Sequence, residues 1–331
     1  MEEQSDISKI PSSSDDAFDN TLRPKFLRDY IGQEKVKDSL GVFIKAAQLR
    51  DEPIEHILIY GPPGLGKTTL AHVLANETGS SIRVTSGPAI ERAGDLVSIL
   101  TSLEDSDIIF IDEIHRLGRM VEEVLYPAME DFAVDLVVGK GPSAKTLRVD
   151  LPKFTLIGAT TRISLISSPM RDRFGIVHSL DFYTEKELEK IITRSAKILD
   201  MKIENSGVKE IAKRSRKTPR IANRLLKRVR DFATVYNKGQ ADHTTASDAL
   251  TRLGVDEYGL DDADRKVIKT IIEKFGGGPV GAETLSAATS IERDTIEDVI
   301  EPYLMRSGFI KRTPRGRVAC SLAFDYFGMK K

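Results

Sequence analysis

Gly61-Pro-Pro-Gly-Leu-Gly-Lys-Thr68 fits the spacing G-x-x-x-x-G-K-[ST], a loop whose backbone N–H groups surround phosphate oxygens. The apolar run at residues 57–60 before it predicts a buried strand, and residues 69–75 after it predict a helix. The loop glycines allow positive φ and close approach to phosphate, and the helix N-terminus adds partial positive charge. We therefore expect a nucleoside triphosphate here, with Lys67 on the β- and γ-phosphates and Thr68 on Mg²⁺.

Composition limits the other functions that the chain can have. Its 331 residues carry a net charge of −1, so there is no global basic field for nucleic acid. The single cysteine, Cys320, excludes an internal disulfide and suits a reducing compartment. No stretch approaches the ~18 apolar residues of a membrane span. The first 20 residues are acidic, rich in serine and without an apolar signal region, so we expect a disordered leader and a cytoplasmic protein.

The order of the predicted elements indicates an α/β domain followed by helical domains. Further short strands are predicted at 82–84, 108–111 and 154–157, and helical segments separate them. Strands that alternate with helices predict a parallel sheet covered on both faces. Residues 184–253 have a helical pattern throughout. The last segment has helical runs at 261–275, 283–289 and 292–306, and two short strands follow within 309–320, which predicts a winged helix-turn-helix.

Two carboxylates, Asp112 and Glu113, end the predicted buried strand at 108–111. At the carboxyl edge of a parallel sheet, Asp112 can hold Mg²⁺ and Glu113 can polarise the attacking water. Acidic residues after an apolar strand are also common in turns, but a phosphate loop upstream favours the hydrolytic interpretation. His115 could be a metal ligand, but without a second histidine at ligand spacing, a polar role beside the site is the better interpretation.

Nine motifs together resemble the RuvB family of AAA+ ATPases, over roughly residues 21–328. They are Leu22-Arg-Pro-Lys25, Tyr30-Ile-Gly-Gln33, the phosphate loop with Thr69, Asp112-Glu-Ile-His-Arg-Leu117, Gly158-Ala-Thr-Thr-Arg162, Arg171-Asp-Arg-Phe-Gly175, Thr218-Pro-Arg220, Gly276-Gly-Gly-Pro-Val-Gly281 and Arg312-Thr-Pro-Arg-Gly-Arg317. Many AAA+ proteins share the earlier motifs, and the last two in this order are specific to RuvB. The resemblance implies an ATPase domain at 21–183, a helical lid at 184–255 and a winged-helix domain at 256–331.

The resemblance also implies roles for individual residues in ATP hydrolysis. Thr161 resembles sensor 1, Arg220 resembles sensor 2, and Arg173 resembles the arginine finger that reaches the nucleotide of the next subunit. Without the motif, Arg173 would be interpreted as a surface ion pair with Asp172, worth under about 1 kcal/mol. The basic run from 213 to 230 alternates with apolar residues, so we expect a solvated helix face that includes Arg220. The implied nucleotide-binding residues are Leu22, Arg23, Gly64, Gly66, Lys67, Thr68, Thr69, Tyr183 and Arg220.

Binding partners are implied at two further places. Residues 302–324 hold five basic residues and no acidic one. This local positive charge either binds a phosphate backbone or only makes the surface soluble. By resemblance, Arg293, Arg312 and Arg317 contact double-stranded DNA. The predicted hairpin at 132–149 is either a core element or, as in the family, the docking site for a RuvA-type junction-binding protein. The resemblance further implies a homo-hexamer acting on Holliday junctions, with a RuvC-type resolvase in the same assembly.

Two other functions fit parts of the sequence. Replication initiators also join an AAA+ module to a winged helix, as ATP-gated DNA-binding switches with slow turnover and sequence preference. A clamp-loader-like or protein-remodelling ATPase is the third alternative, and the basic wing disfavours it. The motifs at 276–281 and 312–317 favour the branch migration motor over both.

Overall fold

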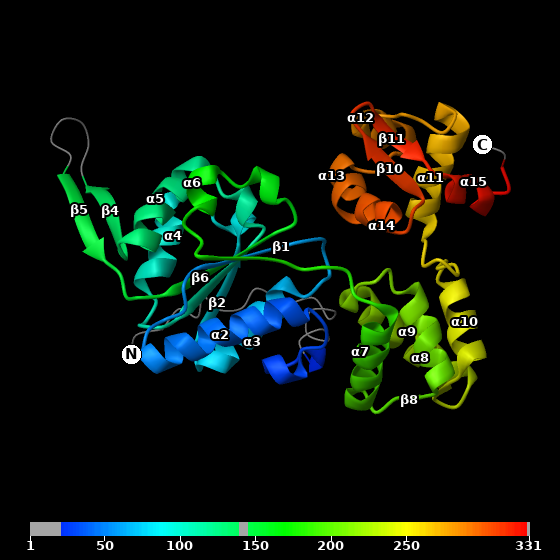
Figure 1. Ribbon diagram of the computed structural model, residues 1–331, viewed down its shortest axis with the longest axis horizontal. Helices are drawn as coiled ribbons and strands as arrows, with labels where there is room; N and C mark the ends of the chain where they lie inside the picture. Colours follow the sequence, from blue (N-terminus) through cyan, green and yellow to red (C-terminus); the bar gives the residue numbers. More distant parts are fainter. Residues whose placement is uncertain (1–20, 139–144, 330–331) are drawn as a thin grey trace, which may run out of the picture. The chain divides into compact units, whose positions relative to one another are not determined.

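The computed structural model describes residues 21–138 and 145–329 (Figure 1). The chain divides into two compact units, each made of two segments. One unit joins the residues up to Pro24 to Tyr183–Asp262, and the other joins Lys25–Phe182 to Ala263–Lys331. The predicted leader at residues 1–20 lies outside the described residues. Within the described part of the chain, no helix has the length and apolarity of a membrane span.

A parallel five-stranded sheet forms the core of Lys25–Phe182, as the fold prediction required. Its strands, in the order β2-β3-β6-β1-β7, are β2 (Ile82–Ser86), β3 (Ile108–Asp112), β6 (Thr155–Thr160), β1 (Ile57–Tyr60) and β7 (Ile176–Ser179). The three central strands are buried almost throughout, because their apolar side chains face helices on both sides. The edge strand β7 was not predicted, since its sequence, Ile-Val-His-Ser, has too short an apolar run.

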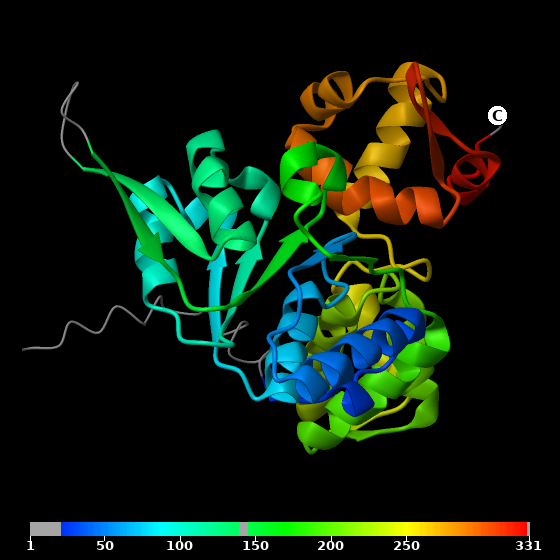
Figure 2. The same ribbon diagram turned by 60° about the vertical axis from the view of Figure 1, so that its left-hand side comes forward.

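Helices cover the two faces of this sheet (Figure 2). Helices α4 (Ala93–Thr101) and α5 (Arg119–Glu130) pack their apolar sides with Leu58, Ile109 and Leu156 in one buried cluster. Helices α2 (Glu34–Arg50) and α3 (Lys67–Thr78) lie on the opposite side of the sheet. Side chains alternate along a strand, so each central strand contributes to both layers.

An antiparallel hairpin interrupts the alternation of strands and helices. Strands β4 (Ala133–Val138) and β5 (Lys145–Asp150) pair from Ala133 opposite Asp150 to Val138 opposite Lys145, and they form a separate two-stranded sheet. The hairpin extends away from the central sheet beyond α5 (Figure 1). Its base is anchored by the buried Val134, whereas Leu147 is 54% exposed. The predicted pair of strands is therefore present as a projecting element.

The segment Tyr183–Asp262 is almost entirely helical, with α7 (Glu185–Ile198), α8 (Asn205–Arg214), α9 (Pro219–Tyr236) and α10 (His243–Arg252). One short parallel pair, β8 (Lys202–Ile203) with β9 (Gln240–Ala241), was not predicted. The expected solvated basic face is only partly correct. Arg214 and Arg216 are buried, and acidic partners compensate their charges: Arg214 pairs with Glu210 at 2.5 Å and Arg216 lies 3.5 Å from Asp261.

The last segment is a winged helix, as predicted. It contains α11 (Asp262–Phe275), α12 (Ala282–Thr289), α13 (Arg293–Thr295), a five-residue π-helical turn (Ile296–Ile300), α14 (Glu301–Arg306), β10 (Ile310–Thr313), β11 (Gly316–Ala319) and α15 (Ser321–Tyr326). The glycine-rich segment at 276–281 packs along the wing, because Val280 forms a two-way antiparallel bridge with Arg317. Gly278 must lack a side chain, since a Cβ there would lie 2.3 Å from the Arg317 carbonyl oxygen.

Candidate functional site

The phosphate loop joins the end of β1 to the start of α3, as its sequence predicts. Gly66 has φ of +99°, and a Cβ at this position would lie 2.7 Å from the Tyr30 hydroxyl oxygen. Gly64 also has positive φ, a backbone conformation that glycine adopts without strain. The first N–H groups of α3, at Lys67, Thr68 and Thr69, have no carbonyl partner within the helix. The loop therefore presents donors and a helix N-terminus to an anion.

Lys67, the first residue of α3, is buried, with 8% of its surface exposed. Its Nζ donates to the carbonyl oxygens of Gly61 at 2.7 Å and Pro62 at 3.0 Å. Burial lowers the pKa of Lys67 to about 8, and the charges of Asp112 and Glu113 oppose this shift. The ammonium group contacts two neutral carbonyl oxygens, and a bound triphosphate would give it a directly paired anion.

The acidic pair lies where β3 ends. The Glu113 N–H donates to Asp112 Oδ1 at 2.9 Å, which fixes the Asp112 carboxylate against the backbone of the next residue. Glu113 has φ of +48°, a left-handed conformation that is costly for a non-glycine residue and is common at functional sites. Its carboxylate pairs with Arg116 at 3.0 Å, and both side chains are about half exposed. Glu113 is therefore accessible to a water molecule.

The donor set also fits a magnesium nucleotide. In the described part of the chain, no group of three histidine, cysteine or acidic side chains could hold a metal ion by itself. Mg²⁺ in phosphate sites is usually held by one or two protein oxygens together with phosphate oxygens and water. Thr68 and Asp112 supply such oxygens, at the ends of neighbouring elements on one edge of the sheet. The residues present therefore fit Mg²⁺ delivered with a nucleotide.

Strand β6 lies between β1 and β3, so its end faces both the phosphate loop and the acidic pair. The buried Thr160 hydroxyl lies 2.9 Å from His115 Nδ1 and accepts from the Arg162 N–H at 2.9 Å. Burial lowers the pKa of His115, against the opposing charge of Glu113. Thr161, the predicted sensor 1, follows directly and is half-buried. Sequence reasoning missed the bond between His115 and Thr160, because their pairing depends on which strands are neighbours.

Arg173, the predicted arginine finger, lies just after the short helix α6 (Ser168–Arg171). Its guanidinium carbon lies 4.5 Å from the centroid of the Tyr126 ring. One Nη donates to the Pro169 carbonyl at 2.7 Å, and the other pairs with Glu130 at 3.1 Å. The ion pair considered from the sequence, with Asp172, is replaced by the pair with Glu130 on α5. The side chain is therefore held against α5, and 22% of it is exposed.

The remaining predicted nucleotide-binding residues belong to the other unit. Leu22 and Tyr183 are buried there, with 1% and 3% exposure, and Arg23 is half-buried. The Leu22 carbonyl accepts from Arg194 at 3.0 Å, and the Tyr183 N–H donates to the Lys217 carbonyl at 3.0 Å. Arg220 is exposed in the first turn of α9. Their contact with a nucleotide stays a prediction.

The three predicted DNA-contacting arginines differ sharply in exposure. The side chains of Arg293 and Arg312 are 52% and 61% exposed, whereas that of Arg317 is 7% exposed. All three approach one carboxylate, Glu297 of the π-helical turn, at 3.2, 3.9 and 2.7 Å respectively. The basic field of the wing is therefore carried by only some of its arginines.

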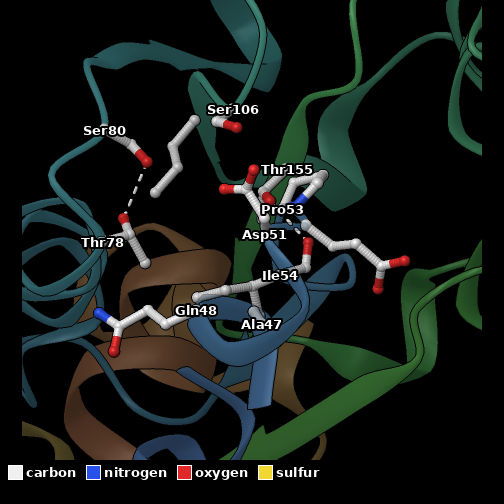
Figure 3. A pocket seen from close by; sticks show the side chains of 11 residues that line it. Ala47, Gln48, Asp51, Pro53, Ile54, Thr78, Ser80, Ser106 and Thr155 are labelled. Carbon is white, nitrogen blue, oxygen red and sulfur yellow. Dashed lines mark hydrogen bonds between the residues drawn. The ribbon is translucent and has the colours of Figure 1, made fainter. Parts of the chain in front are cut away.

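A pocket of about 130 Å³ lies at the opposite edge of the central sheet (Figure 3). Its walls include Ile54, Ile108 and Thr155, which lie at or just before the amino ends of β1, β3 and β6. The Thr155 hydroxyl donates to the Ile54 carbonyl at 2.6 Å. Ligands of open parallel sheets bind outside the carboxyl ends of the strands, so this pocket is separate from the nucleotide site.

Comparison with known proteins agrees with this architecture. Three family models match: the Holliday junction DNA helicase RuvB P-loop domain over residues 22–180, the RuvB AAA lid domain over 183–256 and the RuvB C-terminal winged helix domain over 257–328. A solved structure of the Thermotoga maritima RuvB Holliday junction branch migration motor is 50% identical, with 94% of this chain and 99% of that chain covered and a TM-score of 0.87. A point mutant of Thermotoga maritima RuvB is also 50% identical, with coverage of 93% and 99% and a TM-score of 0.88. The chain belongs to the RuvB family.

Proposed function

We propose that this protein is an ATP-hydrolysing motor that translocates double-stranded DNA and drives branch migration of Holliday junctions. One observation carries the proposal: a single chain combines a phosphate loop and acidic pair at one sheet edge with a winged helix whose wing hairpin exposes Lys311, Arg312 and Arg315. The similarity to the Thermotoga motor extends over nearly the whole of both chains, which supports the same activity.

At the ATPase site, we assign each residue a role that suits its position. Lys67 and the N–H groups of α3 bind the β- and γ-phosphates, and Thr68 and Asp112 would hold Mg²⁺. When bound, the metal ion neutralises charge that develops on the phosphate oxygens. Glu113 accepts a proton from the attacking water. Thr161 monitors the γ-phosphate, and Arg220 couples the lid to the nucleotide.

We further propose a homo-hexamer in which Arg173 completes the site of the neighbouring subunit. An arginine finger is worth about 10³–10⁵ in rate, so subunit contacts would control hydrolysis.

The exposed Leu147 of the β4–β5 hairpin suits docking of a RuvA-type partner, and Leu147→Asp should abolish co-purification with that partner without changing ATPase activity. A RuvC-type resolvase in the same assembly and a cytoplasmic location complete the proposal.

Two linked assays test the motor function. ATP hydrolysis is measured with several duplexes of unrelated sequence, and displacement of a four-way junction is then measured with the RuvA-type partner present. We expect stimulation by every duplex and junction displacement that Lys67→Ala abolishes. Slow turnover with a preference for one sequence would refute the motor and favour the initiator-like switch. Stimulation by protein but not by DNA would favour a remodelling ATPase.

A further inference from the structure

The side chain of Arg162 ties the turn after strand β6 to the winged helix. Its Nε donates to Asp298 Oδ1 at 2.5 Å, and one Nη donates to Asp294 Oδ1 at 2.9 Å. Both carboxylates belong to the segment Ala263–Lys331, which forms one compact unit with the segment Lys25–Phe182 that holds Arg162. One guanidinium therefore joins the ATPase segment to the winged-helix segment.

This fork is partly shielded from solvent. The side chains of Arg162 and Asp298 are 24% and 26% exposed, whereas that of Asp294 is 77% exposed. The hydrogen bond to Asp298 raises the pKa of Arg162, and the hydrogen bond from Arg162 lowers the pKa of Asp294. Hydrogen bonds between charged partners are roughly twice as strong as neutral ones, so the fork is a firm connection.

On the ATPase side, the backbone of Arg162 is bonded to groups of the nucleotide site. The Arg162 N–H donates to the Thr160 hydroxyl at 2.9 Å, and that hydroxyl lies 2.9 Å from His115 Nδ1. His115 lies in the short 3-10 turn that directly follows Glu113. Thr161, which we assign to the γ-phosphate, lies between Thr160 and Arg162. A shift of Arg162 would therefore move Thr161 and, through His115, the segment next to Glu113.

On the other side, Asp294 and Asp298 belong to a short helical stretch that also contacts the wing. They lie four residues apart in α13 and the π-helical turn, as do Arg293 and Glu297, whose side chains pair at 3.2 Å. Glu297 also pairs with Arg317 of the wing strand β11 at 2.7 Å. The stretch is thus bonded to the wing through Glu297 and to the ATPase segment through the two aspartates.

We propose that Arg162 is a positioning residue that couples DNA binding by the winged helix to ATP binding, by transmitting a shift of Asp294 and Asp298 to the turn that carries Thr161. This inference rests on the proposed motor function and deepens it. A ligand that moves the winged helix must strain or release the fork. By linkage, a nucleotide that moves the turn then changes the affinity for DNA by the same factor.

The test measures this coupling on the full-length protein. The affinity for a non-hydrolysable fluorescent ATP analogue is determined with and without a saturating duplex of arbitrary sequence, and the affinity for the duplex is determined with and without the analogue. In the wild type, we expect both ratios to be equal and about 5- to 150-fold. Asp298→Asn should bring both ratios close to one, because it removes the charge of the more buried partner, and should leave the affinity for the analogue without DNA unchanged. Asp294→Asn should lower them less.

Two further variants separate coupling from a general effect of charge or structure. Glu292→Gln removes the same charge from an exposed side chain two residues before Asp294 and should keep the wild-type ratios. Arg162→Glu alone places like charges together and should abolish the coupling. The charge swap Arg162→Glu/Asp298→Arg rebuilds an ion pair and should restore part of it.

Unchanged ratios in Asp298→Asn would overturn the inference, as would an equal loss of coupling in Glu292→Gln. A charge-swap variant that is folded by circular dichroism but stays uncoupled would also overturn it. If Asp298→Asn does not fold, Asp294→Asn decides the question in the same assay. A wild-type protein that binds both ligands with ratios of one refutes this inference alone, whereas a wild-type protein that does not bind duplex DNA refutes the proposed function itself.

Discussion

Replacing Glu113 by glutamine should stop ATP turnover while leaving folding and nucleotide binding intact. Among the described residues, the change removes one ion pair, the pair with Arg116, between side chains that are 44% and 59% exposed. Such exposed pairs are worth at most about 1 kcal/mol, so the loss of stability is small. Loss of a general base costs about 10²–10⁴ in rate. That factor corresponds to about 3–5 kcal/mol of activation free energy.

The assay separates binding from hydrolysis. Affinity is measured with a fluorescent ATP analogue, and turnover is measured as phosphate release in the presence of DNA. Glu123→Gln is the matched control, because Glu123 forms a similar exposed pair with Arg119 at 3.1 Å on α5. We expect Glu113→Gln to bind the analogue within about threefold of wild type and to lose at least about 10² in turnover, with the control unaffected.

Two results would refute this reasoning. Wild-type turnover by Glu113→Gln would remove the water-activating role. An equal loss in Glu123→Gln would show that the effect comes from charge or from α5 and not from the position of the carboxylate beside the phosphate loop. A loss of analogue binding in Glu113→Gln would instead assign the residue to nucleotide binding.

Three further predictions concern the same domain. Gly66→Ala should weaken nucleotide binding at least about tenfold, because the added Cβ would clash with the Tyr30 hydroxyl. Gly79→Ala is the control: φ is +70° there but no atom lies within 4 Å, so the change should cost only about 1 kcal/mol of stability. Equal nucleotide binding by the two variants would contradict this. The pKa of Lys67 is about 8, so the free protein loses this positive charge above pH 8. ATP affinity should therefore fall up to about tenfold per pH unit from pH 8 to 10, and ATP binding in that range should take up a proton, which calorimetry detects. Lys67→Arg should show no such uptake. Tyr126→Ala should lower the ATP turnover of the assembled protein about 2- to 30-fold, since the contact of the ring with Arg173 is worth about 0.5–2 kcal/mol. Tyr126→Phe keeps an aromatic ring and should retain most of the wild-type turnover. Equal rates for the two variants would contradict this.

Features that depend on neighbouring residues in the chain could be predicted from the sequence. The phosphate loop, the buried strand that ends at Asp112 and the wing hairpin were all assigned correctly in type and place, because glycine spacing, apolar runs and turn residues act locally. The succession of strands and helices was likewise enough to indicate a parallel sheet and its helical neighbours. Strand β7 was missed because its pairing with β1, and not its composition, makes it a strand.

Contacts between distant segments required the tertiary structure. Strand order brings Thr160 to His115, and the position of α5 brings Tyr126 and Glu130 to Arg173. The clearest case is the run from Arg312 to Arg317, whose arginines look equivalent in sequence. Strand pairing points Arg317 toward two carboxylates and leaves Arg315 at the exposed turn. A side chain's charge is determined by its residue type, but the field it exerts on a partner depends on burial and on the opposite charges that the fold places beside it.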